Sequence, residues 1–380
     1  MQASPMPVRM PRRITIVSAS VGAGHDGAAT ELARRLEAQG FAVDRHDFLD
    51  LLPAALGRVL RRAYAVQLQV APDSWGRLLA ALERHPSLAA AAAGCTRLAA
   101  RRISRTLQPG TEAVVSTYPL ASQALGGLRR RCLLEVPVIT YLTDLSVHPL
   151  WVADGVDAHL ALHRVAAEQA ERLGAAGVQV AVPAVPPAFH AAASALERRA
   201  ARLRFGLPHE DEPLALVVAG SWGVGDVAET AREIAASGLA TPVVVCGLNT
   251  ALREDVRSGI ALGWVDDMPA LMRACDVVVQ NAGGLSSLEA LASGLPVISY
   301  RCLPGHGSTN AAALDQAGWA PWVRCPEELR EALTVSLAAG TTVVGSSSAQ
   351  EGTDPADFIA ALAGSQVFTP LQELAAAGGF

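Results

Sequence analysis

Two distant stretches of the chain pass from an apolar strand through a glycine-rich turn into a helix, and this arrangement restricts the fold more than any other feature. In the first, ITIVSAS leads into VGAGHDG and the amphipathic run AATELARRLEAQG. In the second, DVVVQ leads into NAGG, the helical run LSSLEALASG and another apolar run, PVISY. Such units build parallel sheets that carry helices on both faces. The sequence therefore predicts an α/β fold made of Rossmann-like units.

The length of the chain and the repetition of this pattern predict two domains. A chain of 380 residues is longer than a domain with a single hydrophobic core usually is. The proline cluster VPAVPPAFH separates the two sets of strands and helices. We expect a first domain over 13–185, a linker over 186–212, a second domain over 213–340, and a flexible segment with a last helix near 369–377 over 341–380.

Composition and charge exclude several classes of protein. Only 18% of the residues are charged and the net charge is -5, so no general affinity for nucleic acid is expected. No apolar run is long enough for a transmembrane helix, and no apolar leader precedes the first strand. The six cysteines form no C-x-x-C pair, which is typical of reduced thiols and favours a cytoplasmic location.

The first turn has a formal G-x-G-x-x-G pattern at Gly22, Gly24 and Gly27. Asp44 follows at about the distance of the acid that binds ribose in dinucleotide-binding enzymes, so an oxidoreductase is one interpretation. However, His25 occupies the tip of the turn, where a dinucleotide loop needs small residues against the pyrophosphate. An imidazole at this position is better explained by chemistry in a cleft.

The second turn has the features of a nucleotide site. Gly283 and Gly284 allow a ligand to approach the backbone closely, and Ser286 or Ser287 can cap the helix that follows. The free amides and the positive end of the helix dipole favour an anion such as a diphosphate. Glu289 lies one turn further along, where a carboxylate can accept hydrogen bonds from two ribose hydroxyls.

These motifs carry a resemblance to a known family. The stretch from VVAGSWGVG through GWVDDMPALMRACDVVVQNAGGLSSLEALASGLPVI to PGHGSTNA resembles the donor domain of family 28 glycosyltransferases, which have the GT-B fold of two Rossmann-like domains facing a cleft. SASVGAGHDGAA and YLTDLSVHPLW are similar to the acceptor domain of monogalactosyldiacylglycerol synthases and processive diacylglycerol glucosyltransferases. The resemblance implies inverting transfer of a hexose from a UDP-sugar to a lipid hydroxyl, most simply that of diacylglycerol, at the cytoplasmic face of a membrane.

The resemblance also implies which residues bind the donor. Gly283, Gly284 and Ser286 would hold the diphosphate, Glu289 the ribose, and the backbone at Trp264 and Val265 would border the uracil. The complete set of expected donor-binding residues is Gly220, Ser221, Gly223, Trp264, Val265, Gly283, Gly284, Leu285, Ser286, Glu289, His306 and Asn310. No metal or other cofactor is expected, because no Asp-x-Asp element is present and a helix N-terminus can stabilise the leaving diphosphate.

An inverting transfer needs a base that takes the proton of the acceptor hydroxyl. Candidates are His25, whose pKa the start of a helix would lower, Asp144 at the end of a strand, and His148. Asp144 would either orient His25 or act as the base itself. Gly24, His148 and Trp151 are expected at the acceptor pocket, although a packed loop would also account for His148 and Trp151.

The stretch 52–85 alternates Arg58, Arg61, Arg62 and Arg77 with apolar residues. A basic amphipathic stretch of this kind can lie on an anionic lipid surface, which suits an enzyme with a lipid acceptor. An ordinary surface helix with solvated arginines is the alternative interpretation.

One part of the motif differs from the family, and it leaves the donor open. Where the family has Pro-Gly-Gln-Glu, this chain has Pro304, Gly305, His306 and Gly307, so a carboxylate that would reach sugar hydroxyls is missing. Two other functions therefore remain open. One is a transferase for another acceptor, or a UDP-sugar epimerase, on the same fold. The other is a weakly catalytic protein that binds sugar nucleotides.

Overall fold

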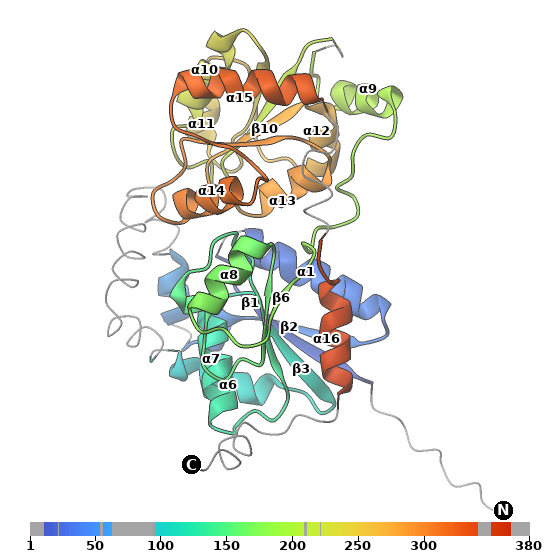
Figure 1. Ribbon diagram of the computed structural model, residues 1–380, viewed down its shortest axis with the longest axis vertical. Coiled ribbons are helices and arrows are strands. Elements are labelled where there is room, and N and C mark those ends of the chain that lie inside the picture. Colours follow the sequence, from blue (N-terminus) through green and yellow to red (C-terminus); the bar gives the residue numbers. More distant parts are fainter. Residues whose placement is uncertain are drawn as a thin grey trace, which may run out of the picture.

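Two parallel six-stranded sheets organise the chain, and the computed structural model describes residues 11–21, 23–53, 56–62, 94, 96–208, 211–220, 222–340 and 351–365. The first sheet has the order β2-β1-β3-β4-β5-β6 and the second the order β12-β11-β10-β7-β8-β9, with every pairing parallel. The domains stack so that α13 and α14 of the second face α1 and α8 of the first (Figure 1).

The first domain is built around β1, whose apolar residues are buried because helices cover both faces of the sheet. Its strands are β1 (Arg13–Ser18), β2 (Ala42–Asp47), β3 (Thr111–Ser116), β4 (Val138–Tyr141), β5 (Ala158–Ala161) and β6 (Val178–Val180). Its helices are α1 (Ala23–Ala38), α2 (Phe48–Leu51), α6 (Arg97–Thr106), α7 (Pro119–Arg130), the 3-10 helix η1 (Pro149–Trp151) and α8 (Arg164–Arg172).

The second domain repeats the plan around β7 and β10, which are buried along their length. Its strands are β7 (Leu214–Val218), β8 (Thr241–Val245), β9 (Ile260–Leu262), β10 (Val277–Gln280), β11 (Val297–Tyr300) and β12 (Trp322–Val323). Its helices are α9 (Ala195–Arg204), α10 (Val227–Ser237), α11 (Thr250–Asp255), α12 (Met268–Ala274), α13 (Leu285–Ala292), α14 (His306–Gln316) and α15 (Pro326–Ala339).

The helix in the expected linker, α9, packs on the second domain. Arg202 is buried there and donates hydrogen bonds from Nε to the Ala274 carbonyl at 2.9 Å and from Nη2 to Asp276 Oδ2 at 3.0 Å. Because a buried guanidinium needs such partners, these contacts fix α9 beside α12. The linker therefore contributes a helix to the second domain.

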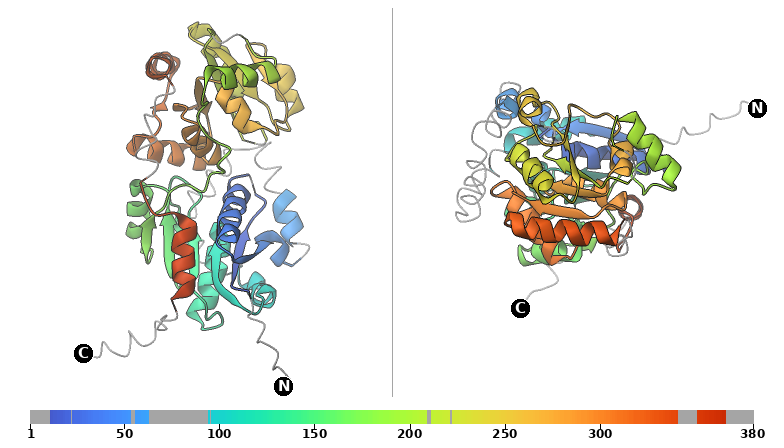
Figure 2. Two further views of the ribbon diagram at one scale, coloured as in Figure 1. Left: turned by 90° about the vertical axis from the view of Figure 1, so that its right-hand side faces the viewer. Right: turned by 90° about the horizontal axis from the view of Figure 1, so that it is seen from above.

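The end of the chain returns to the first domain. Helix α16 (Pro355–Gly364) lies along that domain beside α1 (Figure 2), where Arg35 pairs with Asp354 at 2.8 Å and Gln39 donates to Asp357 at 2.7 Å. The helix expected near 369–377 lies outside the described residues, as do residues 341–350 of the expected flexible segment. The first domain is thus assembled from two separate parts of the described chain.

Candidate active site

The two glycine-rich turns meet where the domains face each other. Helices α1 and α13 are in contact, and a Cβ on Gly27 would lie 2.6 Å from Leu285 Cδ2. The leucine side chain therefore uses the space that glycine leaves on α1. Because ligands of parallel α/β sheets bind at the carboxyl ends of the strands, this junction is the candidate active site.

His25 lies in the first turn of α1, which begins at Ala23, and not at the tip of a loop as expected from the sequence; two threonines orient its ring. Its Nδ1 lies 2.8 Å from the Thr117 carbonyl oxygen and 2.8 Å from Thr143 Oγ1. A carbonyl oxygen can only accept, so Nδ1 carries the hydrogen that is donated to Thr117. The lone pair of the neutral ring is therefore on Nε2, which is the form that a general base requires.

The surroundings of His25 also keep it neutral. Burial lowers its pKa, and the positive charge of His306 lowers it further, although Asp144 opposes both. The rings of Tyr118 and Trp151 pack against the imidazole at centroid distances of 5.2 and 6.0 Å. The pKa moves in the direction expected from the sequence, but burial is the main cause.

Asp144 follows β4 and is buried, with both carboxylate oxygens engaged. Oδ2 accepts a hydrogen bond from Trp151 Nε1 at 2.7 Å, and Oδ1 lies 3.0 Å from His306 Nε2. Burial alone would raise the pKa of Asp144, but the charge and hydrogen bond of His306 outweigh it, so the pKa falls below its ordinary value. A carboxylate near His25 is thus held ionised by a histidine of the other domain.

Trp151, His148 and Gly24 occupy different positions around this centre. Trp151 is 1% exposed and reaches the site through its hydrogen bond to Asp144. His148 precedes η1, and its Nδ1 accepts a hydrogen bond from the Leu150 amide at 3.2 Å. Gly24 is in contact range of Leu285, because a Cβ on it would lie 4.0 Å from Leu285 Cβ.

Helix α14 connects the domains beside His306. Asn310 Oδ1 accepts hydrogen bonds from the amide and the hydroxyl of Ser146, each at 2.9 Å. Asn310 Nδ2 donates to the Ala282 carbonyl at 3.3 Å, so the same side chain also holds the turn after β10. Gly307 is buried, and a Cβ there would lie 2.7 Å from the Asn281 carbonyl oxygen. The packing therefore leaves no room for a glutamate at this position.

The turn after β10 exposes the start of α13. Gly283 has a φ of 72°, and a Cβ on it would lie 2.8 Å from Asn310 Cβ. Gly284 is the N-cap and makes no side-chain hydrogen bond, so neither serine caps the helix, and Ser286 lies in its first turn. The first amides of a helix have no partner within it, and together with the dipole they favour an anion.

Glu289 is mostly buried in the second turn of α13. Burial raises the pKa of its carboxyl group to about 8. Among the described residues, none donates a hydrogen bond to it or forms an ion pair with it. Because a buried carboxylate without a partner is unfavourable, its surroundings suit hydroxyl groups of a ligand.

The remaining expected donor residues lie on two further loops. Gly220 and Gly223 follow β7, and Asn249 holds that loop by donating to the Gly223 carbonyl at 3.1 Å. Trp264 follows β9 and is 56% exposed, whereas Val265 packs against the core. Ser221 lies outside the described residues.

Several residues that support the site carry no recognisable sequence signal. Asn281 Nδ2 donates to the Val224 carbonyl at 2.7 Å, and the Asn281 carbonyl accepts from the Leu303 amide at 2.9 Å. Asn281 thereby connects three loops of the second domain. In the sequence, only the position of Asn281, just after an apolar strand and shortly before two glycines, pointed to this supporting role. Thr117 and Thr143 were missed in the same way.

Asp44 is not available for a nucleotide ribose. Its carboxylate forms a bidentate ion pair with Arg13 Nη1, at 2.7 and 2.8 Å. The acid that supported the dinucleotide interpretation of the first turn is therefore occupied within the sheet, between β1 and β2.

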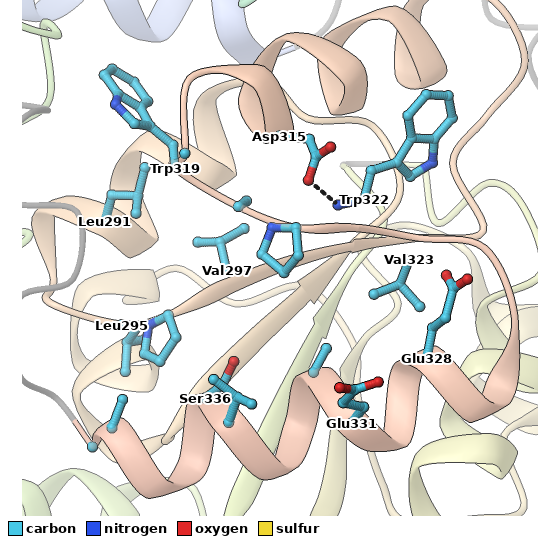
Figure 3. A pocket seen from close by; sticks show the side chains of 18 of the residues that line it. Leu291, Leu295, Val297, Asp315, Trp319, Trp322, Val323, Glu328, Glu331 and Ser336 are labelled. Carbon is cyan, nitrogen blue, oxygen red and sulfur yellow. Dashed lines mark hydrogen bonds between the residues drawn. The ribbon is translucent and has the colours of Figure 1, made fainter.

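A separate pocket of about 470 Å³ lies at the other end of the second sheet, between β11, β12 and α15 (Figure 3). Trp319, Trp322 and Val335 contribute to its apolar lining, and Glu328 and Glu331 lie on α15. None of the expected site residues lines it. Over the described part of the chain, no helix is long and apolar enough to cross a membrane, and no group of three acidic, histidine or cysteine side chains is placed to bind a metal.

Comparison with known families divides the chain at the same place as the two sheets. Residues 25–186 match the family model of monogalactosyldiacylglycerol (MGDG) synthase, and residues 213–339 match that of glycosyl transferases group 1. The chain is 29% identical to the processive diacylglycerol beta-glucosyltransferase of Bacillus subtilis over 60% of its length, and 26% identical to that of Bacillus licheniformis over 59%. The matched regions cover 62% and 60% of these relatives. The resemblance inferred from the motifs is confirmed.

Solved structures show the same architecture. MurG of Acinetobacter baumannii superposes with a TM-score of 0.56 at 17% identity, over 92% of this chain and 100% of MurG. HepE of Anabaena, solved in complex with UDP-glucose, superposes with a TM-score of 0.54 at 15% identity, over 96% of this chain and 98% of HepE. These likenesses confirm the predicted GT-B fold, in which two Rossmann-like domains face each other.

Proposed function

We propose that this chain, whose two domains are of the monogalactosyldiacylglycerol synthase and processive diacylglycerol glucosyltransferase type, transfers a hexose from a UDP-sugar to the hydroxyl of a lipid such as diacylglycerol. One observation carries the proposal. His25 Nδ1 donates its hydrogen to the Thr117 carbonyl, so the basic lone pair of the ring is on Nε2. The helix that carries His25, α1, packs against α13, whose N-terminus suits an anion.

The reaction is an inverting displacement. His25 Nε2 takes the proton of the acceptor hydroxyl as its oxygen forms a bond to the anomeric carbon. The bond from that carbon to the diphosphate breaks, and its electron pair leaves with UDP. Asp144 stabilises the imidazolium by charge, because it is ionised and close enough to raise the pKa of His25.

The donor is held by the second domain. The first amides of α13, at Leu285 and Ser286, receive the diphosphate, and the helix dipole stabilises the charge that develops on it. Glu289 accepts hydrogen bonds from the ribose hydroxyls, and the loop at Trp264 and Val265 borders the uracil. Gly220 and Gly223 form the opposite wall. No side chain fits at Gly307 and His306 Nε2 is engaged by Asp144, so the polar pair that the family uses for the sugar has no direct replacement here.

The lipid acceptor requires contact with a membrane surface, which we propose to be the cytoplasmic face. Residues 56–62 are helical, and they expose Arg58, Val59, Leu60 and Arg62, while Arg61 pairs with Asp47 at 2.9 Å. An exposed helix that carries both basic and apolar side chains suits an anionic bilayer. The rest of the basic stretch, 63–85, lies outside the described residues.

The direct test measures UDP release. The full chain is incubated with UDP-glucose, UDP-galactose and other UDP-sugars, each with and without vesicles that contain diacylglycerol. We expect release that depends on both one donor and the lipid, with a glycolipid as product. Interconversion of UDP-sugars without lipid would instead identify an epimerase, and absence of lipid-dependent release with every donor would refute the proposal.

We propose that the transfer needs no metal, because a helix N-terminus supports the leaving group. Turnover is therefore expected to change less than about twofold when EDTA or Mg²⁺ is added. A catalytic metal would stabilise the transition state by several kcal/mol, so its removal would lower turnover far more than that. Initial rates over a range of both additives check this. Loss of activity in EDTA that Mg²⁺ or Mn²⁺ restores would contradict the proposal.

A further inference from the structure

One charged contact joins the two domains at the centre of the candidate active site. His306 begins α14 in the second domain, and its Nε2 lies 3.0 Å from Oδ1 of Asp144 in the first. The carboxylate is buried, and Trp151 fixes its other oxygen at 2.7 Å. Asp144 is thus held from both sides, once by its own domain and once by the opposite domain.

Neutral hydrogen bonds lie next to this contact. Ser146 donates from its amide and its hydroxyl to Asn310 Oδ1, each at 2.9 Å, and its hydroxyl oxygen also lies 2.9 Å from Thr309 Oγ1. Asp144 and Ser146 belong to one loop after β4, and His306 and Asn310 belong to one helix. The loop after β4 and helix α14 are therefore joined by one contact that titrates, Asp144 with His306, and by neutral hydrogen bonds that do not titrate in the neutral range.

We propose that His306 is a positioning residue, which closes the cleft by pairing with Asp144 and thereby holds that carboxylate beside His25. The inference deepens the proposed function, because His25 is the base there, but closure of the cleft can be measured without a substrate. The family has a glutamine at this position, and a neutral amide cannot form an ion pair with Asp144. Closure in this chain therefore depends on protonation of His306, whereas a glutamine at this position would have the same charge at every pH.

The charges around His306 give the direction of the pH dependence. Asp144 and His25 face it across the cleft, and Asp26 follows His25 on α1. From the side of α8, which contacts α14, the nearest titratable group is the N-cap residue His163. Burial lowers the pKa of His306, but Asp144 outweighs burial and raises it, whereas burial keeps His163 uncharged with a pKa of about 4. Opening removes Asp144 from His306, so closure takes up a proton. The closed form is favoured below the raised pKa and loses this support as the pH rises through it.

Small-angle scattering of the full chain without ligands tests the proposal. The radius of gyration is measured from about pH 6 to about pH 9, across the range in which an imidazole with a raised pKa titrates. For the wild type we expect an increase on the alkaline side. His306→Gln should be more open at low pH and should show no such change. Ser146→Ala, the matched control, removes the hydroxyl but keeps the amide that donates to Asn310, so it should increase the radius of gyration by a similar amount at every pH and keep the wild-type pH dependence.

Turnover gives a second measurement that a purely structural role would not change. In His306→Gln the alkaline limb of the kcat profile, measured at saturating donor, should disappear, while the acid limb set by His25 should remain. If His306→Gln keeps the wild-type scattering profile at every pH, or retains its pH dependence, the proposal is wrong. Because scattering requires no substrate, that result is independent of whether the proposed transferase activity is found. Circular dichroism of each variant verifies that it is folded.

Discussion

Replacing His25 by alanine should lower kcat by about 10²–10⁴-fold and leave the affinity for UDP within about twofold, because general base catalysis typically contributes a factor of that size. The imidazole lies in α1 of the first domain, whereas the expected nucleotide contacts lie in the second. The change therefore removes the proton acceptor without removing a donor contact. Single-turnover rates with donor and lipid, combined with calorimetric titration of UDP, separate the two effects.

The pH profile of the wild type gives an independent check of the same role. Burial lowers the pKa of His25, so its neutral form persists to lower pH than that of an ordinary histidine. The rate should fall only when the pH drops below this lowered value, and His25→Ala should lose that acid limb. His190→Ala, at an exposed histidine outside the site, is the control and should resemble the wild type. Unchanged turnover of His25→Ala would exclude His25 as the base.

Replacing Glu289 by glutamine should weaken UDP binding and stabilise the fold at the same time. Hydrogen bonds from the ribose to a carboxylate are stronger than those to an amide, so we expect about a tenfold loss of affinity near pH 8, where about half of the wild-type carboxyl groups are ionised. Because the bound form is ionised, UDP affinity of the wild type should rise between about pH 6 and about pH 8. Glu289→Gln should lack this rise.

The effect on stability follows from the same raised pKa. The unfolded chain ionises Glu289 above the ordinary value of 4.5, whereas the folded chain resists ionisation up to about 8. The free energy of unfolding therefore decreases as the pH rises between these values, and Glu289→Gln removes the loss. We expect a gain of about 4 kcal/mol near pH 8 and almost none near pH 4.5, measured by chemical unfolding.

A substitution on an exposed face provides the control for Glu289. Glu331→Gln on α15 removes an exposed carboxylate outside the expected nucleotide site, and it should leave UDP affinity unchanged. Equal UDP affinity of Glu289→Gln and the wild type near pH 8 would remove Glu289 from the nucleotide site. Such a result would leave the assignment of His25 intact, because the two residues belong to different domains.

The sequence by itself determined the architecture, because the signals for it are local. The apolar run VVVQ, the glycines after it and the helical run from Leu285 are contiguous, and each follows from backbone preferences and burial. The terminal helix α16 was missed, since its run PADFIAALAG has no strong amphipathic period and follows a stretch rich in serine and glycine. Its position became clear only from one ion pair and one hydrogen bond with α1.

Only the tertiary structure decided how the side chains of the site are oriented and charged. The tautomer of His25 depends on a carbonyl 92 residues away, and the charge of Asp144 depends on a histidine 162 residues away. The first contact lies within one domain and the second joins the two domains, and both arise when segments far apart in the sequence pack together, so no local pattern of residues encodes them. The sequence could therefore name His25, Asp144 and His306 separately. Their arrangement, with Asp144 between two imidazoles, is a consequence of how the domains pack.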